Sequence, residues 1–235
     1  MADRLGRNPH AGWLEASQES AGNGALMRIA PVILPHLSTP SSALWADALL
    51  GGAVTHNDFA SSAACVGFMG VLWDALRAVP PVAPGFWLER FSELARLVES
   101  DVPRYLPRSP DLPAHPTCMW ALTDRLVREA LAVGRSVAAA CDRWYSGAFL
   151  LETMPSVLYI LERHGSDPEE AIVRAVNDTR DNDTIAAVVG AAVGALHGRD
   201  ALPRRWRDGL LGRSGADDDG RVFELIERAR QRLCT

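Results

Sequence analysis

The sequence predicts an all-α protein that folds as a compact bundle of many helices. Apolar residues recur at helical spacing along most of the 235 residues, and no segment shows the alternation typical of a strand. The breaks between these segments carry residues that start helices, and Gly165 and Gly198 follow two of them as stops. Helices are therefore expected over Ser41–Val54, Asp58–Val79, Phe86–Ser100, Met119–Val133, Gly147–Arg163, Pro168–Val176, Thr184–His197 and Arg221–Leu233.

The residues at each break justify these boundaries. Ser41-Ser42 and Asn57-Asp58 place capping side chains before the first two helices. Ser166-Asp167-Pro168-Glu169 does the same before the sixth helix, with proline at the first helical position. Two proline-rich stretches, Val79–Gly85 and Pro103–Pro116, are short and are predicted to be surface loops. Residues 1–235 are therefore expected to form a single domain.

The composition excludes several kinds of chemistry. Hydrophobic residues make up 48% of the chain and charged residues 23%, which suits a globular domain with a sizeable core. All 24 basic residues are arginine, so a Gly-Lys-Ser/Thr phosphate loop and a Schiff-base or general-base lysine are excluded. The net charge of −5, with no long basic run, argues against nucleic acid as a partner.

Cysteine usage and hydropathy predict a cytoplasmic protein. Cys65, Cys118, Cys141 and Cys234 are widely separated, so neither a zinc site nor a disulfide framework is expected. The N-terminal residues lack the apolar segment of a secretory signal, and the longest apolar run, Ile185–Leu196, is too short to cross a bilayer. We expect no membrane association, and no oligomeric state is predicted.

Two carboxylates and a hydroxyl stand at the head of the most apolar segment. In Asp181-Asn182-Asp183-Thr184 the acids are two residues apart and the threonine follows at once. Oxygen donors in this pattern suit a hard cation such as Mg²⁺, Mn²⁺ or Ca²⁺, which would also relieve the repulsion between the acids. The alternative is an ordinary helix start, in which Asp183 or Thr184 caps backbone N–H groups.

The helix after these acids, Ile185–Gly198, is expected to be the central helix of the bundle. It is apolar on every face and sets Gly190, Gly194 and Gly198 four residues apart, as tight packing on all sides would require. Acids at the head of a buried helix need compensation, which in a chain without lysine comes from arginine or from a metal ion. Arg180 is adjacent, so the residues alone leave both open.

A second segment, Ser20–Arg28, combines glycines with a short run of helix formers. Gly22 and Gly24 flank an asparagine and permit positive φ and close approach of a ligand to the backbone. The following Ala25-Leu26-Met27 would direct N–H groups at an anion if it began a helix. A lone Gly-x-Gly is weak evidence, and a plain turn before a helix is the simpler interpretation.

Two further segments place polar or aromatic side chains at helix ends. His56, in Thr55-His56-Asn57-Asp58, fits either a hydrogen-bonded histidine at a helix cap or a residue beside a ligand. Trp144-Tyr145-Ser146-Gly147 offers rings that could stack on a base or sugar, although core packing is the commoner fate of such rings.

Taken in order, the segments GNGALMRIAPV, THNDFASSAAC and VNDTRDNDTIAAVVGAAVGALHG resemble the ADP-ribosylglycohydrolase family. The resemblance implies an all-α bundle that holds two Mg²⁺ or Mn²⁺ ions. It also implies cleavage of the glycosidic bond between ADP-ribose and a protein side chain or related acceptor. The N-terminal part of the family domain, with a Gly-Asp-Ala-Leu-Gly-like segment and a Thr-Asp-Asp set of ligands, is expected to be missing from this chain.

Carried over position by position, the resemblance assigns roles to residues in all these segments. It makes Asp181, Asp183 and Thr184 metal ligands, with Asp183 placed to bridge both ions, and makes the two acids the catalytic pair. Arg28 would support the glycine loop around the ribose and phosphates. The substrate-binding residues that it implies are Gly22, Asn23, Gly24, Ala25, Met27, His56, Tyr145, Ser146 and Gly147.

The expected function is metal-dependent hydrolysis of an ADP-ribosylated protein or a small ADP-ribose derivative. Two octahedral ions need about twelve coordination positions, of which Asp181, Asp183 and Thr184 fill a few. The alternative is therefore a catalytically silent protein that binds ADP-ribose or a related nucleotide through the Gly22–Ala25 loop. A purely structural helical module is a third hypothesis, and it predicts that neither ligand binds.

Overall fold

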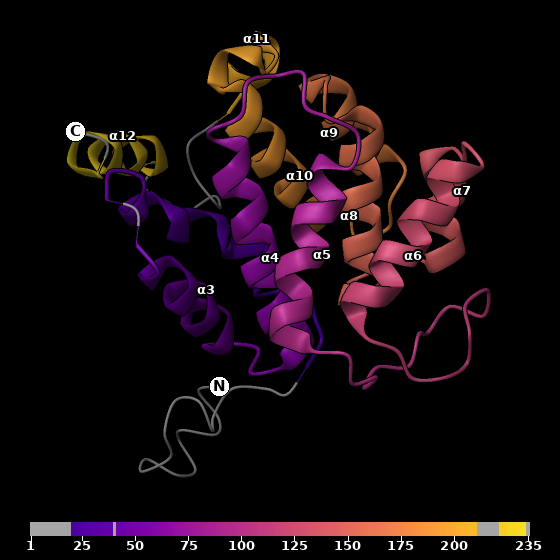
Figure 1. Cartoon of the computed structure of the whole chain (residues 1–235). Helices are drawn as coiled ribbons and strands as arrows, with labels where there is room; N and C mark the ends of the chain where they lie inside the picture. The colour runs from indigo at the N-terminus through magenta and orange to yellow at the C-terminus, as the bar shows by residue number, and fades with distance from the viewer. Residues whose placement is uncertain (1–19, 40, 211–220, 234–235) are drawn as a thin grey trace.

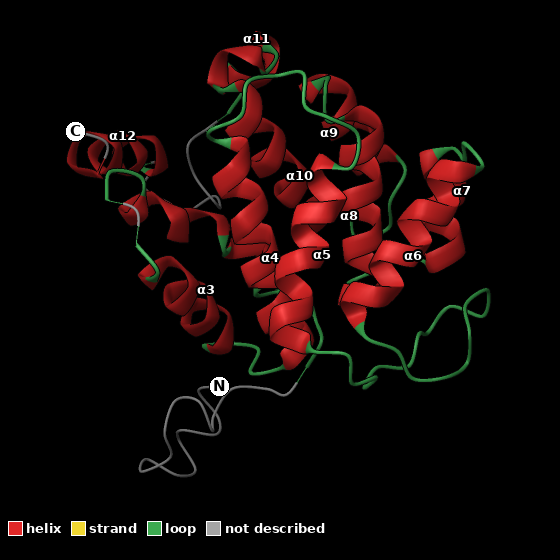
Figure 2. Cartoon of the chain, viewed as in Figure 1, coloured by secondary structure: helices red, strands yellow, loops and turns green. Residues whose placement is uncertain are grey.

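The all-α prediction is confirmed in a computed structural model, which describes residues 20–39, 41–210 and 221–233. Helices joined by loops fill these ranges, and no strand occurs within them (Figure 2). The helices are α3 (Ala43–Ala53), α4 (Phe59–Ala75), α5 (Phe86–Glu99), α6 (Met119–Ala132), α7 (Val137–Trp144), α8 (Leu150–His164), α9 (Pro168–Asn177), α10 (Asn182–His197), α11 (Arg204–Arg207) and α12 (Val222–Leu233).

Three 3-10 helices supplement them: η1 (Leu26–Arg28), η2 (Ala30–His36) and η3 (Arg199–Ala201). The η2 segment is apolar enough for a buried α-helix, yet Pro31 and Pro35 remove two of its backbone N–H donors. The periodicity argument placed no element at η1, η2, η3, α7 or α11, because each is too short to show a clear repeat.

The core of the bundle is formed around α4 and α8 (Figure 1). Every residue from Ala63 to Leu72 of α4 is buried, as is every residue from Leu150 to Leu161 of α8. A side chain at Gly67 would bring its Cβ within 2.8 Å of the Phe91 ring, so this glycine lets α4 and α5 approach closely. Helices α4 and α8, rather than α10, are therefore the innermost elements of the described residues.

The expectation that α10 is packed on every side is therefore wrong for the described part of the chain. Ile185, Val188 and Val189 are buried in the core, but Ala187 on the other face is exposed. A Cβ added to Gly194 would meet no atom within 4 Å. Alanine and glycine leave little apolar area in water, so an open face of this kind costs little free energy.

Most boundaries agree with the predicted ones, and two differ. The helix expected over Asp58–Val79 ends at Ala75, before the prolines. The helix expected over Gly147–Arg163 begins at Leu150, because Tyr145 and Ser146 adopt left-handed backbone conformations that no regular helix contains.

The predicted caps are present to different degrees. Asp58 accepts hydrogen bonds from the backbone N–H groups of Ala60 and Ser61 at the start of α4. Asp167 does the same for α9, with Pro168 at the first helical position. Ser42 occupies the N-cap of α3 but makes no side-chain capping bond.

None of the described helices has the length and apolar character needed to cross a membrane. Cys65, Cys118 and Cys141 are free, buried thiols, and Cys234 lies outside the described residues.

Candidate functional site

The glycine loop and the head of α10 meet, although 158 residues separate Asn23 from Asp181. The Asn23 side chain is 5% exposed, and its Nδ2 donates to Asp181 Oδ2 and, at 2.9 Å, to Thr153 Oγ1 on α8. A buried amide that joins three segments keeps them in a defined register. The structure thus brings together two of the motifs that the sequence singled out.

The acids at the head of α10 are not used as helix caps. Asp181 occupies the N-cap position, and its side chain makes no capping hydrogen bond. Asp183 and Thr184 lie inside the first turn, so neither stands at the cap that the alternative interpretation requires. Asp183 is exposed, whereas Thr184 is 3% exposed. The capping alternative is therefore not supported.

A strained loop runs beside these acids. Tyr145 and Ser146 have φ values of 78° and 46°, which are rarely adopted by residues other than glycine. The loop contacts the head of α10 directly, because Asp181 N donates to Ser146 O at 3.0 Å and Arg180 N donates to Ser146 Oγ at 3.2 Å. Backbone strain of this kind persists when surrounding bonds over-determine the conformation.

The other side of the same loop is joined to the glycine loop and α8. Asn23 N donates to Ala148 O at 3.1 Å, and Gly22 pairs with Phe149 in an isolated antiparallel bridge. Thr153 Oγ1 donates to Gly147 O at 2.8 Å. The segment 145–149 is therefore clamped between the glycine loop, α8 and α10.

The glycines of this site are required by close contacts. Gly22 and Gly24 pack against the His56 ring, and an added Cβ would lie 3.1 Å from its Nε2 and 2.9 Å from its Cε1, respectively. Neither glycine uses the positive φ that its residue type permits, and positive φ values occur instead at Tyr145 and Ser146 of the 145–149 loop. Gly147 is similar, because its Cβ would lie 2.6 Å from Glu152 Oε2.

His56 is a partly buried residue beside the glycine loop. Burial lowers its pKa, and the nearby Arg28 guanidinium lowers it further. Its Nδ1 lies 2.9 Å from Thr55 Oγ1, while Arg28 Nη2 donates to the same hydroxyl at 2.7 Å. The α4 cap is formed by Asp58, so His56 is not the capping side chain.

The remaining predicted residues have supporting positions. Ala25 is fully buried and anchors the glycine loop in the core. Met27, two residues later, is half-exposed. The expected helix after the glycines is the three-residue turn η1, which is too short to direct a dipole at an anion.

The head of α10 carries oxygen donors of the type that divalent cations bind. Asp181, Asp183 and Thr184 present side-chain oxygens within one helical turn, and carboxylate and hydroxyl oxygens are the donors that Mg²⁺ and Mn²⁺ prefer. In residues 20–39, 41–210 and 221–233, no group of three or more histidine, cysteine or acidic side chains could hold an ion.

Sequence reasoning missed three side chains of this site. Thr153 and Glu152 lie in the buried run of α8, and Arg108 lies in the loop before α6. Arg108 pairs with Glu152 through two hydrogen bonds of 2.9 and 3.0 Å. A buried glutamate inside an apolar helix is the one signal that could have indicated a partner.

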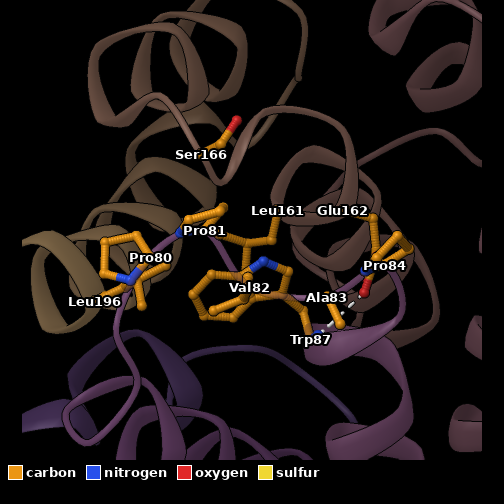
Figure 3. Close-up of a pocket in the computed structure, with 10 residues that line it drawn as sticks. All are labelled: Pro80, Pro81, Val82, Ala83, Pro84, Trp87, Leu161, Glu162, Ser166 and Leu196. Carbon is orange, nitrogen blue, oxygen red and sulfur yellow. Dashed lines mark hydrogen bonds between the residues drawn. The ribbon is translucent and has the colours of Figure 1, made fainter.

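A separate pocket of about 160 Å³ lies near the other end of α8, lined by the proline segment 80–84, Trp87 and Leu196 (Figure 3). Glu162 borders it and accepts a hydrogen bond of 3.1 Å from Trp87 N. Nine residues of helix, or about 13 Å, separate Glu162 from Thr153. Glu162 is thus engaged by the backbone at the start of α5, and none of the predicted site residues lines this pocket.

Comparison with known proteins identifies the family of the chain. The model of the ADP-ribosylglycohydrolase family matches residues 1–233. The chain belongs to the ADP-ribosylglycohydrolase family. The all-α fold of the described residues is consistent with that family.

Relatives in the family are distant and longer. Protein YegU of Escherichia coli is 26% identical over 194 residues, which cover 80% of this chain and 54% of YegU. ADP-ribosylarginine hydrolase Tri1 of Pseudomonas putida is 23% identical, with 85% and 47% covered. ADP-ribosylhydrolase ARH3 of Danio rerio is 25% identical, with 88% and 58% covered. The chain spans about half the length of these relatives.

Proposed function

We propose that this family member hydrolyses the glycosidic bond of an ADP-ribosylated protein or a small ADP-ribose derivative, with Mg²⁺ or Mn²⁺ bound at the head of α10. The observation that carries the proposal is the junction of Asn23, Thr153 and Asp181. It places a backbone loop with bare glycines directly against the paired acids. A sugar diphosphate and a cation are the ligands that these two features suit.

The roles of the residues follow from their positions. Asp183, exposed in the first turn of α10, would hold the cation together with Asp181 and Thr184. Asn23 orients Asp181 by donating to its carboxylate. The Gly22–Gly24 backbone and the Tyr145–Gly147 loop, which meet through the Gly22 and Phe149 bridge, would receive the ribose and phosphates.

The reaction would replace the acceptor on the anomeric carbon with water. The hydroxyl of the water forms the new bond to that carbon, and the acceptor leaves with the proton. The bound cation would supply polarisation of ribose hydroxyls and of the attacking water. The carboxylates of Asp181 and Asp183 would stabilise positive charge that develops on the sugar.

The names of two relatives support the substrate class. The Pseudomonas protein is named for hydrolysis of ADP-ribosylarginine, and the zebrafish protein is named an ADP-ribosylhydrolase. Both names contain the ADP-ribosyl group, so this group is the part of the substrate that we propose for the present chain.

Replacing Asp183 with asparagine tests the proposal. Release of ADP-ribose from a modified protein should need added Mg²⁺ or Mn²⁺, and Asp183→Asn should reduce it by roughly two orders of magnitude because an anionic ligand is lost. Circular dichroism should show the same helical content, since the side chain is exposed. Asp200→Asn, an exposed acid beyond the far end of α10, is the matched control.

The same assay separates the alternatives. Calorimetric binding of ADP-ribose that is independent of metal and accompanied by no release would favour the silent binding protein. Full release by Asp183→Asn would remove the assigned role of that residue.

A further inference from the structure

Arg180 and Arg108 each contact a side chain that lies beside Gly147 in the 145–149 loop. The Arg180 guanidinium lies 4.6 Å from the centroid of the Tyr145 ring, and that ring lies 3.0 Å from where a Cβ of Gly147 would be. The same Cβ position lies 2.6 Å from Glu152 Oε2, and Glu152 holds Arg108 through two hydrogen bonds.

Both guanidinium groups are fixed by the fold yet face solvent. Arg108 is 58% exposed and stacks on the Phe149 ring at 4.4 Å, while its carboxylate partner is buried. Arg180 is 54% exposed and is stacked on Tyr145. Stacking and bidentate pairing restrict arginine rotamers, so a ligand would meet cations that are already ordered.

The existing partners leave donors for a further anion. The pair between Arg108 and Glu152 uses Nε and Nη2 of the arginine, and its Nη1 lies outside the pair. Arg180 reaches Asp142 through a long contact of 3.4 Å, and the Asp142 side chain is 73% exposed. Such an exposed pair contributes little and is readily exchanged for a diphosphate, which carries one negative charge on each phosphate.

We propose that Arg180 and Arg108 form a cationic rim that binds the phosphate groups of the ligand. The inference rests on the proposed function, because it assigns the diphosphate of an ADP-ribosyl ligand to these two side chains. Asp181 and Asp183 would repel an anion at this place. Two fixed cations beside them offset that repulsion and favour a phosphate-bearing ligand over an uncharged nucleoside.

Calorimetry with the 235-residue chain tests the rim, with ADP-ribose and adenosine as the two probes. Arg180→Gln and Arg108→Gln should each weaken ADP-ribose binding about tenfold, since each removes a hydrogen bond to a charged group. Adenosine binding should not change. Added salt should weaken ADP-ribose binding less in the variants than in the parent chain. Arg180→Lys, which keeps the charge, should retain part of the affinity.

Arg204→Gln is the matched control, because Arg204 is an exposed arginine paired with one acid, Asp208, which follows α11. It should bind both probes as the parent chain does. Unchanged ADP-ribose affinity in both rim variants would overturn the rim, as would equal weakening of both probes. If the parent chain binds ADP-ribose and Asp183→Asn still abolishes release, the proposed function survives that failure. If the parent chain binds neither probe, both fail together.

Discussion

At the scale of single residues, the candidate site depends on three glycines, which have no side chain. Gly22, Gly24 and Gly147 lie where a methyl group would meet His56 or Glu152 at 3.1 Å or less. Their role is to let the glycine loop, the His56 ring and the 145–149 loop approach one another. Small residues in this site therefore determine its geometry as much as its polar residues do.

Gly24→Ala tests this dependence on close contact. The added Cβ would lie 2.9 Å from His56 Cε1, so the ring must move outward, at a cost of about 1 kcal/mol in the free energy of unfolding. Burial is the main cause that lowers the pKa of His56, so an NMR titration should show that pKa rising toward 6.5 in the variant.

The control is Gly194→Ala, whose Cβ meets no atom within 4 Å. It should leave the His56 pKa unchanged and stabilise α10 by about 0.5–1 kcal/mol, because alanine has the higher helix propensity. An unshifted His56 titration in Gly24→Ala would contradict the proposed packing.

At the scale of secondary structure elements, the two predicted N-caps of α3 and α4 differ. The side chain at the start of α4 accepts capping hydrogen bonds, and the one at the start of α3 does not. Asp58 accepts from Ala60 N at 2.9 Å and from Ser61 N at 3.3 Å, and it also accepts from the Tyr105 hydroxyl at 2.9 Å. Ser42 has the same position in α3 without such a bond. The start of α4 is thus tied both to its own backbone and to the loop before α6.

Asp58→Ala and Ser42→Ala make a matched pair at these two N-caps. Asp58→Ala should lower the free energy of unfolding by about 1–2 kcal/mol, because the N–H groups of α4 lose their acceptor. Ser42→Ala should change it by less than about 0.5 kcal/mol. Urea unfolding followed by circular dichroism measures both, and equal losses would show that the caps are not distinct.

At the scale of the whole molecule, one buried acid connects two helices of the bundle. Glu99 at the end of α5 is fully buried and accepts from Met119 N at 2.6 Å and Trp120 N at 2.9 Å at the start of α6. Burial raises the pKa of Glu99 to about 7 from 4.5, against the effect of these two hydrogen bonds. The folded protein therefore holds a proton that the unfolded chain releases near pH 4.5.

The sign of the pH dependence follows from that difference. A raised carboxyl pKa gives a contribution to stability that is full below about pH 4.5 and is lost as the pH rises through about 7. Between about pH 5 and about pH 8, the free energy of unfolding should fall by up to a few kcal/mol from this group. His56, whose pKa is lowered, contributes in the opposite direction as the pH falls below 6.5.

Glu99→Gln isolates the contribution of Glu99. The variant should be less stable overall, since an amide offers one acceptor to two backbone donors. Its stability should nevertheless fall less than that of the parent chain between about pH 5 and about pH 8. Urea unfolding at several pH values provides the comparison, and parallel curves for the two proteins would refute this account of Glu99.

Much of the fold could be predicted from local patterns. The long helices α4, α5, α6, α8, α9, α10 and α12 follow from apolar spacing, and the caps at Asp58 and Asp167 follow from residue type. Short elements such as α7 and η2 could not be predicted, because they contain too few turns to show a period of apolar residues. The sequence also did not predict which helix lies innermost, because α10 is as apolar as α4 but has an exposed face.

The sequence alone determined the all-α class, the family and the segments in which polar oxygens and glycines concentrate. These are properties of neighbouring residues, and neighbouring residues set helix periodicity and motif spacing. Tertiary structure alone decided that Asn23 contacts Asp181 and Thr153. It also decided that Gly22 and Gly24 pack against the His56 ring, and that Arg108 and Arg180 flank one loop. Those contacts join residues far apart in the chain, and packing of the core rather than local preference brings them together.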